Sequence, residues 1–162
     1  MALVAVIADT HMPRGRRRLG ADCLRVLADA ELILHAGDVT SAAVLGELSR
    51  LAPVRAVRGN IDDVELQAML PERLVVEIAG TRIGMIHDAG RRDGRGERLA
   101  AAFAGCDAVV YGHTHLPEIS RHGGLWILNP GSPTERRRAE HRSLIALDVG
   151  KRGIRPTLLA LA

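Results

Sequence analysis

The amino-acid sequence predicts an α/β fold in which strands and helices alternate and several strands are parallel. Short apolar runs rich in β-branched residues alternate with segments of helical length in the amino-terminal part of the chain. Hydrophobic residues make up 47% of the sequence and charged residues 25%, which is the composition of a folded globular protein. Because 162 residues is the usual size of one domain, we expect a single domain over residues 1–162.

The amino-terminal part predicts three parallel strands. Leu3–Ala8 is an unbroken apolar run, as expected for a strand buried on both faces. The next expected elements are a helix over Leu19–Ala28, a strand over Glu31–His35, a helix over Ser41–Leu51 capped by Thr40 or Ser41, and a strand over Val54–Val57. A strand–helix–strand–helix–strand order favours parallel pairing.

The remainder of the chain is richer in strands, and glycines mark its turns. The expected elements are a short helix over Asp63–Met69, a hairpin of Leu74–Ile78 and Arg82–Ile86, a helix over Gly96–Ala104, and strands over Ala108–Tyr111, Glu118–Arg121, Leu125–Leu128, Ser143–Val149 and Ile154–Leu161. The second half of the fold should therefore contain antiparallel pairs.

The charge is weakly basic, which leaves the nature of the partner open. The formal net charge is +3 and the pI is near 9.5. Such a balance fits an anionic partner, but Lys151 is the only lysine beside many arginines and alanines, which equally indicates GC-rich coding. Aromatic residues are only 2% of the chain, which argues against binding of nucleic acid by base stacking. We expect nucleic acid at most as a substrate.

The cysteines and the amino terminus predict a cytoplasmic protein. Cys23 and Cys106 are not in a Cys-x-x-Cys spacing, so we expect buried, reduced thiols. The apolar run Ala2–Ala8 has no basic leader and is interpreted as a strand, not a signal peptide. No segment approaches the roughly 20 apolar residues that cross a bilayer, so no membrane partner is expected.

Polar residues of the types that bind metals stand at the ends of five predicted strands. They are Asp9, His11, Asp38, Asn60, His87, His113 and His115. The carboxyl ends of parallel strands form the edge at which open α/β sheets bind ligands. One Asp or His there would be ordinary, since Asp caps helices and His occurs in loops. The same pattern at five strand ends predicts one site.

The residue types indicate a transition-metal site. A mixture of Asp, His and Asn without a thiolate suits Mn²⁺, Fe²⁺, Ni²⁺ or Zn²⁺ better than a structural tetrahedral zinc site. Asp9 and His11, and again His113 and His115, are two residues apart, which places both members on one face of an extended stretch. Two ions about 3.5–4 Å apart can share a carboxylate and activate a hydroxide.

These blocks resemble, in order and spacing, the signature of calcineurin-like metallophosphoesterases, and the resemblance covers nearly the whole chain. The blocks are Asp9-x-His11, Gly37-Asp38, Gly59-Asn60, His87 and Gly112-His113-x-His115. The small size, Leu34-His35-Ala36-Gly37-Asp38 and Asn129-Pro130-Gly131-Ser132 look like the compact bacterial and archaeal phosphodiesterase branch. The resemblance implies a four-layer αββα sandwich with two mixed β-sheets.

The resemblance also implies roles for individual residues. Carried over from the family, one metal ion is held by Asp9, His11 and His115, the other by Asn60, His87 and His113, and Asp38 bridges the two. The expected cofactor is two divalent ions, first Mn²⁺, with Fe, Ni or Zn as alternatives, and a bridging hydroxide would attack phosphorus in line. Asn60 and His113 are expected to take part in catalysis and, with Arg14, to bind the substrate.

The sequence departs from the family next to Asn60. Larger relatives carry a histidine there that is thought to protonate the leaving group, whereas this chain has Ile61 and then Asp62. Asp62 is therefore interpreted as a general acid, as a partner that orients a metal-bound histidine, or as a solvated loop residue. His35 is expected to form a hydrogen bond near Asp38, and Asp88, where the family commonly has glycine, to alter the local field.

Two loops near the predicted site have alternative interpretations. The arginines at 14 and 16–18 either steer an anionic substrate or lie in a solvated loop. Pro130-Gly131-Ser132 either offers backbone N–H groups to a phosphate or forms a tight turn.

The leading hypothesis is a phosphodiesterase. A diester with a leaving group of low pKa needs little protonation, which fits the missing histidine. A phosphomonoesterase with the same site is an alternative, as is an interaction module like the retromer scaffold subunit, which shares this fold with a degraded metal site. The resemblance also implies a homo-oligomer, either a dimer or a tetramer.

Overall fold

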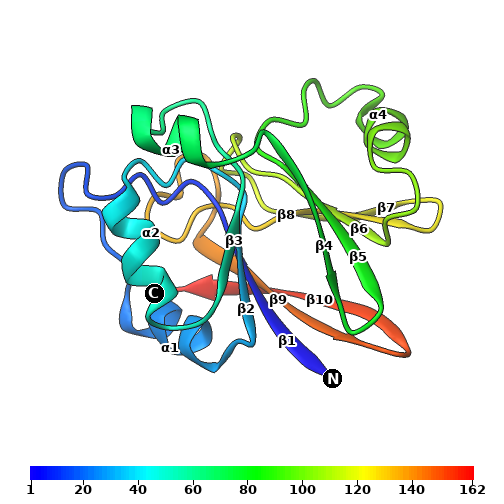
Figure 1. Ribbon diagram of the computed structural model, residues 1–162, viewed down its shortest axis with the longest axis horizontal. Helices are drawn as coiled ribbons and strands as arrows, with labels where there is room; N and C mark the ends of the chain where they lie inside the picture. The colour runs from blue at the N-terminus through cyan, green and yellow to red at the C-terminus, as the bar shows by residue number, and fades with distance from the viewer.

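The computed structural model describes residues 1–162 and has two five-stranded sheets packed face to face, with helices on the outside (Figure 1). In chain order the elements are β1 (Ala2–Ile7), α1 (Ala21–Asp29), β2 (Leu32–His35), α2 (Ala42–Ser49), β3 (Val54–Ala56), α3 (Val64–Met69), β4 (Arg73–Ile78), β5 (Thr81–Ile86), α4 (Arg95–Ala102), β6 (Ala108–Val110), β7 (Glu118–His122), β8 (Leu125–Asn129), β9 (Arg142–Gly150) and β10 (Gly153–Leu161). The predicted α/β class with two mixed sheets is confirmed.

The first sheet has the order β10-β9-β1-β2-β3. Strands β1, β2 and β3 are parallel, as their strand–helix alternation predicts, and β1 pairs with β2 from Val4↔Leu32 to Ile7↔His35. Strand β9 pairs antiparallel with both β1 and β10. The carboxyl ends of β1 and β2 therefore stop side by side.

The second sheet has the order β4-β5-β6-β8-β7. Its three central strands β5, β6 and β8 are parallel, and β4 and β7 pair antiparallel at the edges. The connection from β5 to β6 runs through α4, which is the crossover that a parallel pair requires. The carboxyl ends of β5 and β6 therefore also stop side by side.

Three apolar clusters hold the layers together. A cluster of 16 buried residues lies between the sheets and includes Val6 of β1, Met85 of β5 and Leu128 of β8. A second cluster packs α1 and α2 on the outer face of the first sheet, and a third packs α4 on the second. Figure 1 shows these helices on opposite flanks of the molecule. The shared inner cluster fixes the strand ends of one sheet relative to those of the other.

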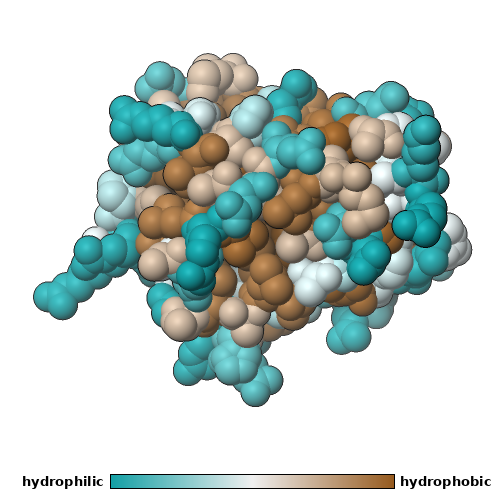
Figure 2. Space-filling model, turned by 90° about the horizontal axis from the view of Figure 1, so that it is seen from below, coloured by the Kyte–Doolittle hydropathy of each residue, from teal (hydrophilic) through white to brown (hydrophobic).

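Apolar side chains also reach the surface of the molecule at the amino ends of the parallel strands, the end opposite to the carboxyl edge. Figure 2 views the molecule from below, where brown apolar atoms reach the surface between teal hydrophilic side chains. The large apolar residues that are exposed anywhere on the protein include Leu24 in α1 and Leu158 in β10. None of the helices is both long and apolar enough to cross a lipid bilayer.

Every expected element is present, and the differences lie at element ends. Helix α1 begins two residues later than expected, because Gly20 is its N-cap. Helix α2 has Ser41 as its N-cap, one of the two residues predicted, but the Ser41 side chain forms no cap hydrogen bond. The Thr40 hydroxyl instead donates to the carbonyl of Met12. Cys23 is buried as expected, whereas Cys106 is partly exposed.

The inner cluster makes a prediction about stability. Leu128 is fully buried between the sheets, so Leu128→Ala should lower the free energy of unfolding by about 2–5 kcal/mol, measured by urea denaturation. Leu158 is 43% exposed on β10, so Leu158→Ala removes the same atoms and should cost about 1 kcal/mol or less. Equal losses in the two variants would contradict a core shared by the sheets.

Candidate metal centre

The seven predicted ligands converge at the carboxyl edge of the parallel strands in both sheets. Asp9 and His11 follow β1, Asp38 follows β2 and Asn60 follows β3. From the second sheet, His87 follows β5, and His113 and His115 follow β6. Side chains from both sheets lie within 4 Å of one another there. The structure thus brings these residues together at one edge, as the sequence predicts.

Asp38 connects histidines from the two predicted ligand sets. Its Oδ2 atom lies 3.3 Å from Nε2 of His11 and 3.3 Å from Nε2 of His87. Asp9 connects the same sets at slightly longer range, because its Oδ1 atom is 3.6 Å from Nε2 of His115 and 3.9 Å from Nε2 of His87. The geometry groups Asp9 with His11 and His115, and Asp9 with Asp38 and His87, as sets able to hold a cation.

The Oδ1 atom of Asp9 is a buried carboxylate oxygen whose charge is not compensated by a hydrogen bond. Asp9 is fully buried, and Oδ1 has no hydrogen-bond partner, although Oδ2 accepts the backbone N–H of His113 at 2.9 Å. A buried carboxylate oxygen without a partner is costly unless a cation compensates it. Imidazole nitrogens surround Oδ1 at 3.6–3.9 Å, which leaves space for an ion between them. The donor set therefore fits a transition-metal ion.

Backbone carbonyls orient two of the histidines from behind. Nδ1 of His87 donates to the carbonyl of Ala36 at 2.7 Å, and Nδ1 of His115 donates to the carbonyl of Glu135 at 3.2 Å. Each bond fixes the proton on Nδ1 and leaves Nε2 directed at the carboxylates. Metal-binding histidines are held in this way in other proteins.

The paired carboxylates shift the pKa values of the residues around them. Burial lowers the pKa of His11, but hydrogen bonds and charges from Asp38 and Asp9 outweigh it and raise the pKa to about 9. His87 is shifted upward for the same reasons. Burial raises the pKa of Asp38, yet the bonds from these two histidines leave it well below its usual range. Without a metal, a proton on His11 therefore offsets part of the negative charge of the carboxylates.

The backbone at the centre is strained. Positive φ angles are rare outside glycine, and five of the predicted ligands have them. These are Asp9 (55°), His11 (48°), Asp38 (59°), His113 (69°) and His115 (60°). Such conformations cost about 1–3 kcal/mol each and persist where the surrounding structure enforces them, typically at functional sites. The strain supports a functional role for this edge.

Glycines that precede the predicted ligands give the ligands room. A Cβ atom on Gly59 would lie 2.0 Å from Oδ1 of Asp38, and a Cβ atom on Gly112 would lie 2.8 Å from Oδ2 of Asp9. The two carboxylates thus occupy the space that the side chain of any other residue at position 59 or 112 would fill. The Gly-Asn and Gly-His pairs of the sequence are a packing requirement of the centre.

His35 lies beside the centre without joining it. Its Nδ1 atom accepts the backbone N–H of Gly37 at 3.2 Å, and its Nε2 atom lies 3.1 Å from the hydroxyl of Thr10. Complete burial lowers its pKa to about 3, so the ring is neutral. Its two partners, Thr10 and Gly37, are next to Asp9 and Asp38 in the sequence, so His35 forms hydrogen bonds near Asp38 as predicted.

Asp62 is buried and ties two ligand loops together. Its Oδ1 atom accepts the backbone N–H of Thr40 at 2.8 Å, and its Oδ2 atom accepts that of Gly59 at 2.6 Å. The interpretation of Asp62 as a solvated loop residue is wrong, since it is only 8% exposed. A proton on either oxygen would compete with one of these bonds, so the geometry favours a positioning role over the predicted general acid.

The predicted substrate-binding residues lie at the mouth. Asn60 and His113 are exposed, and Oδ1 of Asn60 is 3.0 Å from Nε2 of His87. The ring of His113 packs edge-on against His87 at 5.3 Å. Arg14 is exposed, its N–H donates to the carbonyl of His11, and its side chain forms no hydrogen bond or ion pair, so its predicted role in substrate binding stays a prediction. Asp88 is exposed and accepts the N–H of Gly90 at 2.8 Å.

The loop after β8 was not predicted to support the centre. Ser132 donates its hydroxyl to the carbonyl of Asp9 and Thr134 to that of Thr10, each at 2.8 Å. The N–H of Gly131 donates to Asn129 within the same loop, which supports the tight-turn interpretation of Pro130-Gly131-Ser132. Only the Asn-Pro-Gly-Ser turn signal could have indicated this loop, and it does not reveal the distant partners.

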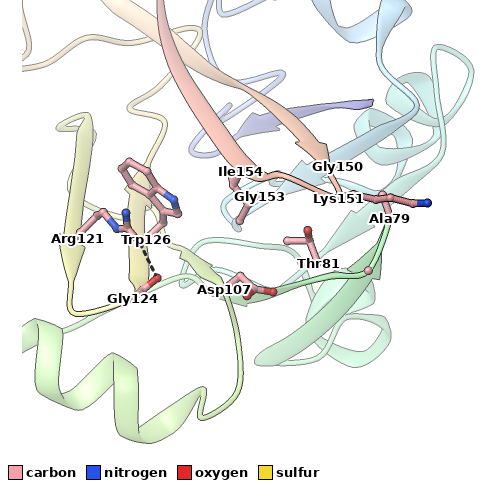
Figure 3. Close-up of a pocket in the computed structure, with 11 residues that line it drawn as sticks. Ala79, Thr81, Asp107, Arg121, Gly124, Trp126, Gly150, Lys151, Gly153 and Ile154 are labelled. Carbon is pink, nitrogen blue, oxygen red and sulfur yellow. Dashed lines mark hydrogen bonds between the residues drawn. The ribbon is translucent and has the colours of Figure 1, made fainter.

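Cavities lie both at the centre and far from it. One of about 180 Å³ is lined by Asn60, His87 and Asp88 among others, and so adjoins the predicted ligands. A cavity of about 430 Å³ lies at the opposite edge, between the turns at 79–81 and 150–154 (Figure 3). There Arg121 stacks over the Trp126 ring at 4.7 Å. None of the predicted ligands lines that cavity, so volume alone does not locate the site.

Comparison with known sequences identifies a family. A profile described as "Calcineurin-like phosphoesterase superfamily domain" matches residues 2–152. A protein of Methanothermobacter thermautotrophicus named "Probable metallophosphoesterase" is 40% identical over 134 residues, which cover 82% of this chain and 77% of the relative. The match includes most of the chain in both comparisons.

Solved structures share the fold at lower identity. Vps29 from Entamoeba histolytica, solved with Zn²⁺, is 24% identical, with a TM-score of 0.77 and 98% of each chain covered. A structure described as a novel archaeal phosphodiesterase is 23% identical, with a TM-score of 0.72, and the match covers 97% of this chain and 99% of that one. These similarities confirm the fold expected from the sequence.

The close approach of Gly59 to Asp38 makes a prediction. Gly59→Ala should displace the Asp38 carboxylate and weaken Mn²⁺ binding, measured by isothermal titration calorimetry, by about 10- to 100-fold. Gly46, in the middle of α2, has no atom within 4 Å of such a Cβ, so Gly46→Ala is the matched control and should bind Mn²⁺ like the unaltered protein. Unchanged binding in the Gly59 variant would contradict the close packing.

The raised pKa of His11 predicts that metal binding strengthens with pH. Because this pKa is about 9, most of the metal-free protein carries a proton on His11 at neutral pH, and a metal ion must displace it. Affinity should rise by about tenfold per pH unit for each proton released, up to about pH 9. Chelator competition with Mn²⁺ at several pH values measures this, and an affinity that does not change over that range would contradict it.

Proposed function

Because the chain belongs to the calcineurin-like phosphoesterase superfamily, we propose that it hydrolyses phosphodiesters at the metal centre on the carboxyl edge of its sheets. The observation that carries the proposal is the buried, unpartnered Oδ1 atom of Asp9 within 4 Å of imidazole nitrogens from three histidines. Such a group needs a cation. The family and the donor set together make metal-dependent hydrolysis of a phosphoric ester the best-supported activity.

We assign the ligands to two ions. Asp9, His11 and His115 would hold the first, Asn60, His87 and His113 would hold the second, and Asp38 would contribute to both. The equal distances of 3.3 Å from Oδ2 of Asp38 to His11 and His87, one from each set, support the bridging role. Both ions would be divalent transition metals, Mn²⁺ first. When bound, they would supply an activated water as nucleophile and neutralise charge on the phosphoryl oxygens.

The chain's own residues divide the remaining tasks by burial. Asp9 and Asp38 are buried and hold charge, whereas Asn60 and His113 are exposed at the mouth, where an incoming phosphate ester arrives. Asn60 can donate its amide N–H to a phosphoryl oxygen, and His113 can donate from its ring. Asp62 keeps the Asn60 loop in place through the N–H of Gly59. These contacts would orient the ester toward the nucleophile.

The diester preference rests on the absence of an evident general acid. Ile61 is apolar, and the oxygens of Asp62 are bound to backbone N–H groups. A leaving group of low pKa needs little protonation, which favours activated diesters over monoesters with poor leaving groups. The similarity to the archaeal phosphodiesterase structure agrees with this preference.

Hydrolysis of bis-p-nitrophenyl phosphate in the presence of Mn²⁺ tests the proposal. Asp38→Asn and His87→Ala should each lower kcat/KM by more than the roughly 10- to 100-fold typical of residues that only orient a metal ligand. Asp29→Asn, an exposed carboxylate at the end of α1, is the control and should keep full activity.

Activity that survives both ligand substitutions, or that is absent with every first-row divalent ion, would contradict the proposal. Comparison with p-nitrophenyl phosphate decides the ester class, because faster turnover of this monoester would assign the chain to the phosphomonoesterases instead.

The fold also supports a second candidate, an interaction module. The observation in its favour is the similarity to Vps29 structures over 98% of each chain. A binding surface does not require a metal, however, and all the predicted ligand positions of this chain are filled. Elemental analysis of the purified and reconstituted protein is the first test, because a protein that takes up no metal cannot be the proposed enzyme. Since a Vps29 structure contains Zn²⁺, bound metal alone does not exclude the module, and hydrolysis of the phosphodiester then decides between the two candidates.

We infer one domain over residues 1–162 from the apolar cluster shared by both sheets. Cytoplasmic localisation and assembly as a dimer or tetramer rest on the sequence interpretation alone.

A further inference from the structure

Glu135 has a buried carboxylate oxygen that none of the roles described above uses. Oε2 of Glu135 is one of three buried side-chain atoms in the protein without a hydrogen-bond partner, together with Oδ1 of Asp9 and Nε of Arg95. The side chain as a whole is 28% exposed, so it is this one oxygen that faces inward. A buried, unsatisfied carboxylate oxygen implies a partner that forms under other conditions.

Three nitrogens lie within 4 Å of this oxygen, namely the Nδ1 atoms of two proposed ligands and Nε of Arg137. Oε2 lies 3.7 Å from Nδ1 of His11 and 4.0 Å from Nδ1 of His115. Nδ1 of His115 already donates to the carbonyl of Glu135, whereas Nδ1 of His11 has no hydrogen bond. The distance of 3.7 Å is too long for a hydrogen bond but is closed by a small movement of either side chain.

Glu135 is held in this place from several directions. Its Oε1 atom accepts from Nη2 of Arg17 at 3.1 Å, and Nε of Arg137 lies 3.7 Å from Oε2. Its N–H donates to the hydroxyl of Ser132, which itself donates to the carbonyl of Asp9. The loop is thus fastened to the same strand end that carries His11. Arg17 binds the outer oxygen, and Arg137 forms an ion pair with Oε2 but no hydrogen bond to it, so the inward oxygen can still accept one.

We propose that Glu135 is a positioning residue for the first metal ion, whose Oε2 atom accepts the Nδ1–H of His11 when Nε2 of His11 is bound to the metal. This inference rests on the proposed metal centre. The bond fixes the tautomer and the ring orientation of His11, as carbonyls do for His87 and His115. It would also complete a set in which every histidine with a buried ring is held from behind.

Metal affinity tests the inference without reference to activity. Glu135→Gln should weaken binding of one Zn²⁺ equivalent by about 10- to 100-fold, measured by chelator competition, while the second equivalent and the melting temperature of the metal-free protein change little. Glu140→Gln removes the same charge from an exposed position in the same loop, where the carboxylate contacts only His141, and should bind as the unaltered protein does.

A spectroscopic signal provides an independent check. In the Zn²⁺-bound protein, the Nδ1 proton of His11 should give a slowly exchanging resonance in long-range ¹H–¹⁵N spectra, and this resonance should be lost or broadened in the Glu135→Gln variant. Glu135→Asp keeps the charge but withdraws the carboxylate by one methylene. Its affinity for Zn²⁺ should therefore lie between that of the unaltered protein and that of the Glu135→Gln variant. It also serves if the Gln variant does not fold.

The possible failures can be told apart. Affinity within twofold of the unaltered protein in both Glu135 variants would overturn the inference alone, because the metal centre would then still be intact. An unaltered protein that binds no metal would overturn the inference and the proposed function together.

Discussion

The structure at the carboxyl edge depends on two buried carboxylates placed side by side. Asp9 and Asp38 end neighbouring parallel strands and are almost completely buried. Two negative charges in a site of low polarity cannot persist without compensation. The raised pKa of His11 and His87 and the unpartnered Oδ1 of Asp9 are consequences of this arrangement. The surrounding histidines supply positive charge when no metal does, and the same nitrogens become available as ligands when a cation replaces their protons.

The position of the two carboxylates depends on the apolar cluster between the two sheets. The cluster between the sheets aligns the ends of β1 and β2 with those of β5 and β6, so loops from different sheets meet. Those loops adopt left-handed backbone conformations at five proposed ligands, a strain that isolated loops would relax. Gly59 and Gly112 remove the side chains that would otherwise displace Asp38 and Asp9. The rigid core thus stabilises a local geometry that is unfavourable by itself.

The sequence predicts the strands and the gathering of polar residues well, because both follow from local patterns. An apolar run such as the one in β1 has few alternatives to a buried strand, and a residue just after it must lie at the sheet edge. Roles that depend on distant partners could not be predicted. Asp62 is fixed by the N–H groups of Thr40 and Gly59, and Thr134 by a carbonyl 124 residues away. For the same reason, the residues next to Glu135 in the sequence do not indicate its place beside the histidines. The bond from Thr40 to the carbonyl of Met12 is likewise a contact between distant residues.

The separation between core and site explains how one fold can serve enzymes and binding modules. No proposed ligand belongs to the three apolar clusters, so the ligands can be lost without opening a cavity in the core. Loss of Asp9 and Asp38 would even remove the need to balance their buried charges. A chain under no selection for metal chemistry would therefore be expected to lose them. This chain keeps both carboxylates, the strained loops around them and the glycines that make room for them. The Oδ1 atom of Asp9 still has no hydrogen-bond partner in this arrangement, and a bound cation would supply the missing compensation.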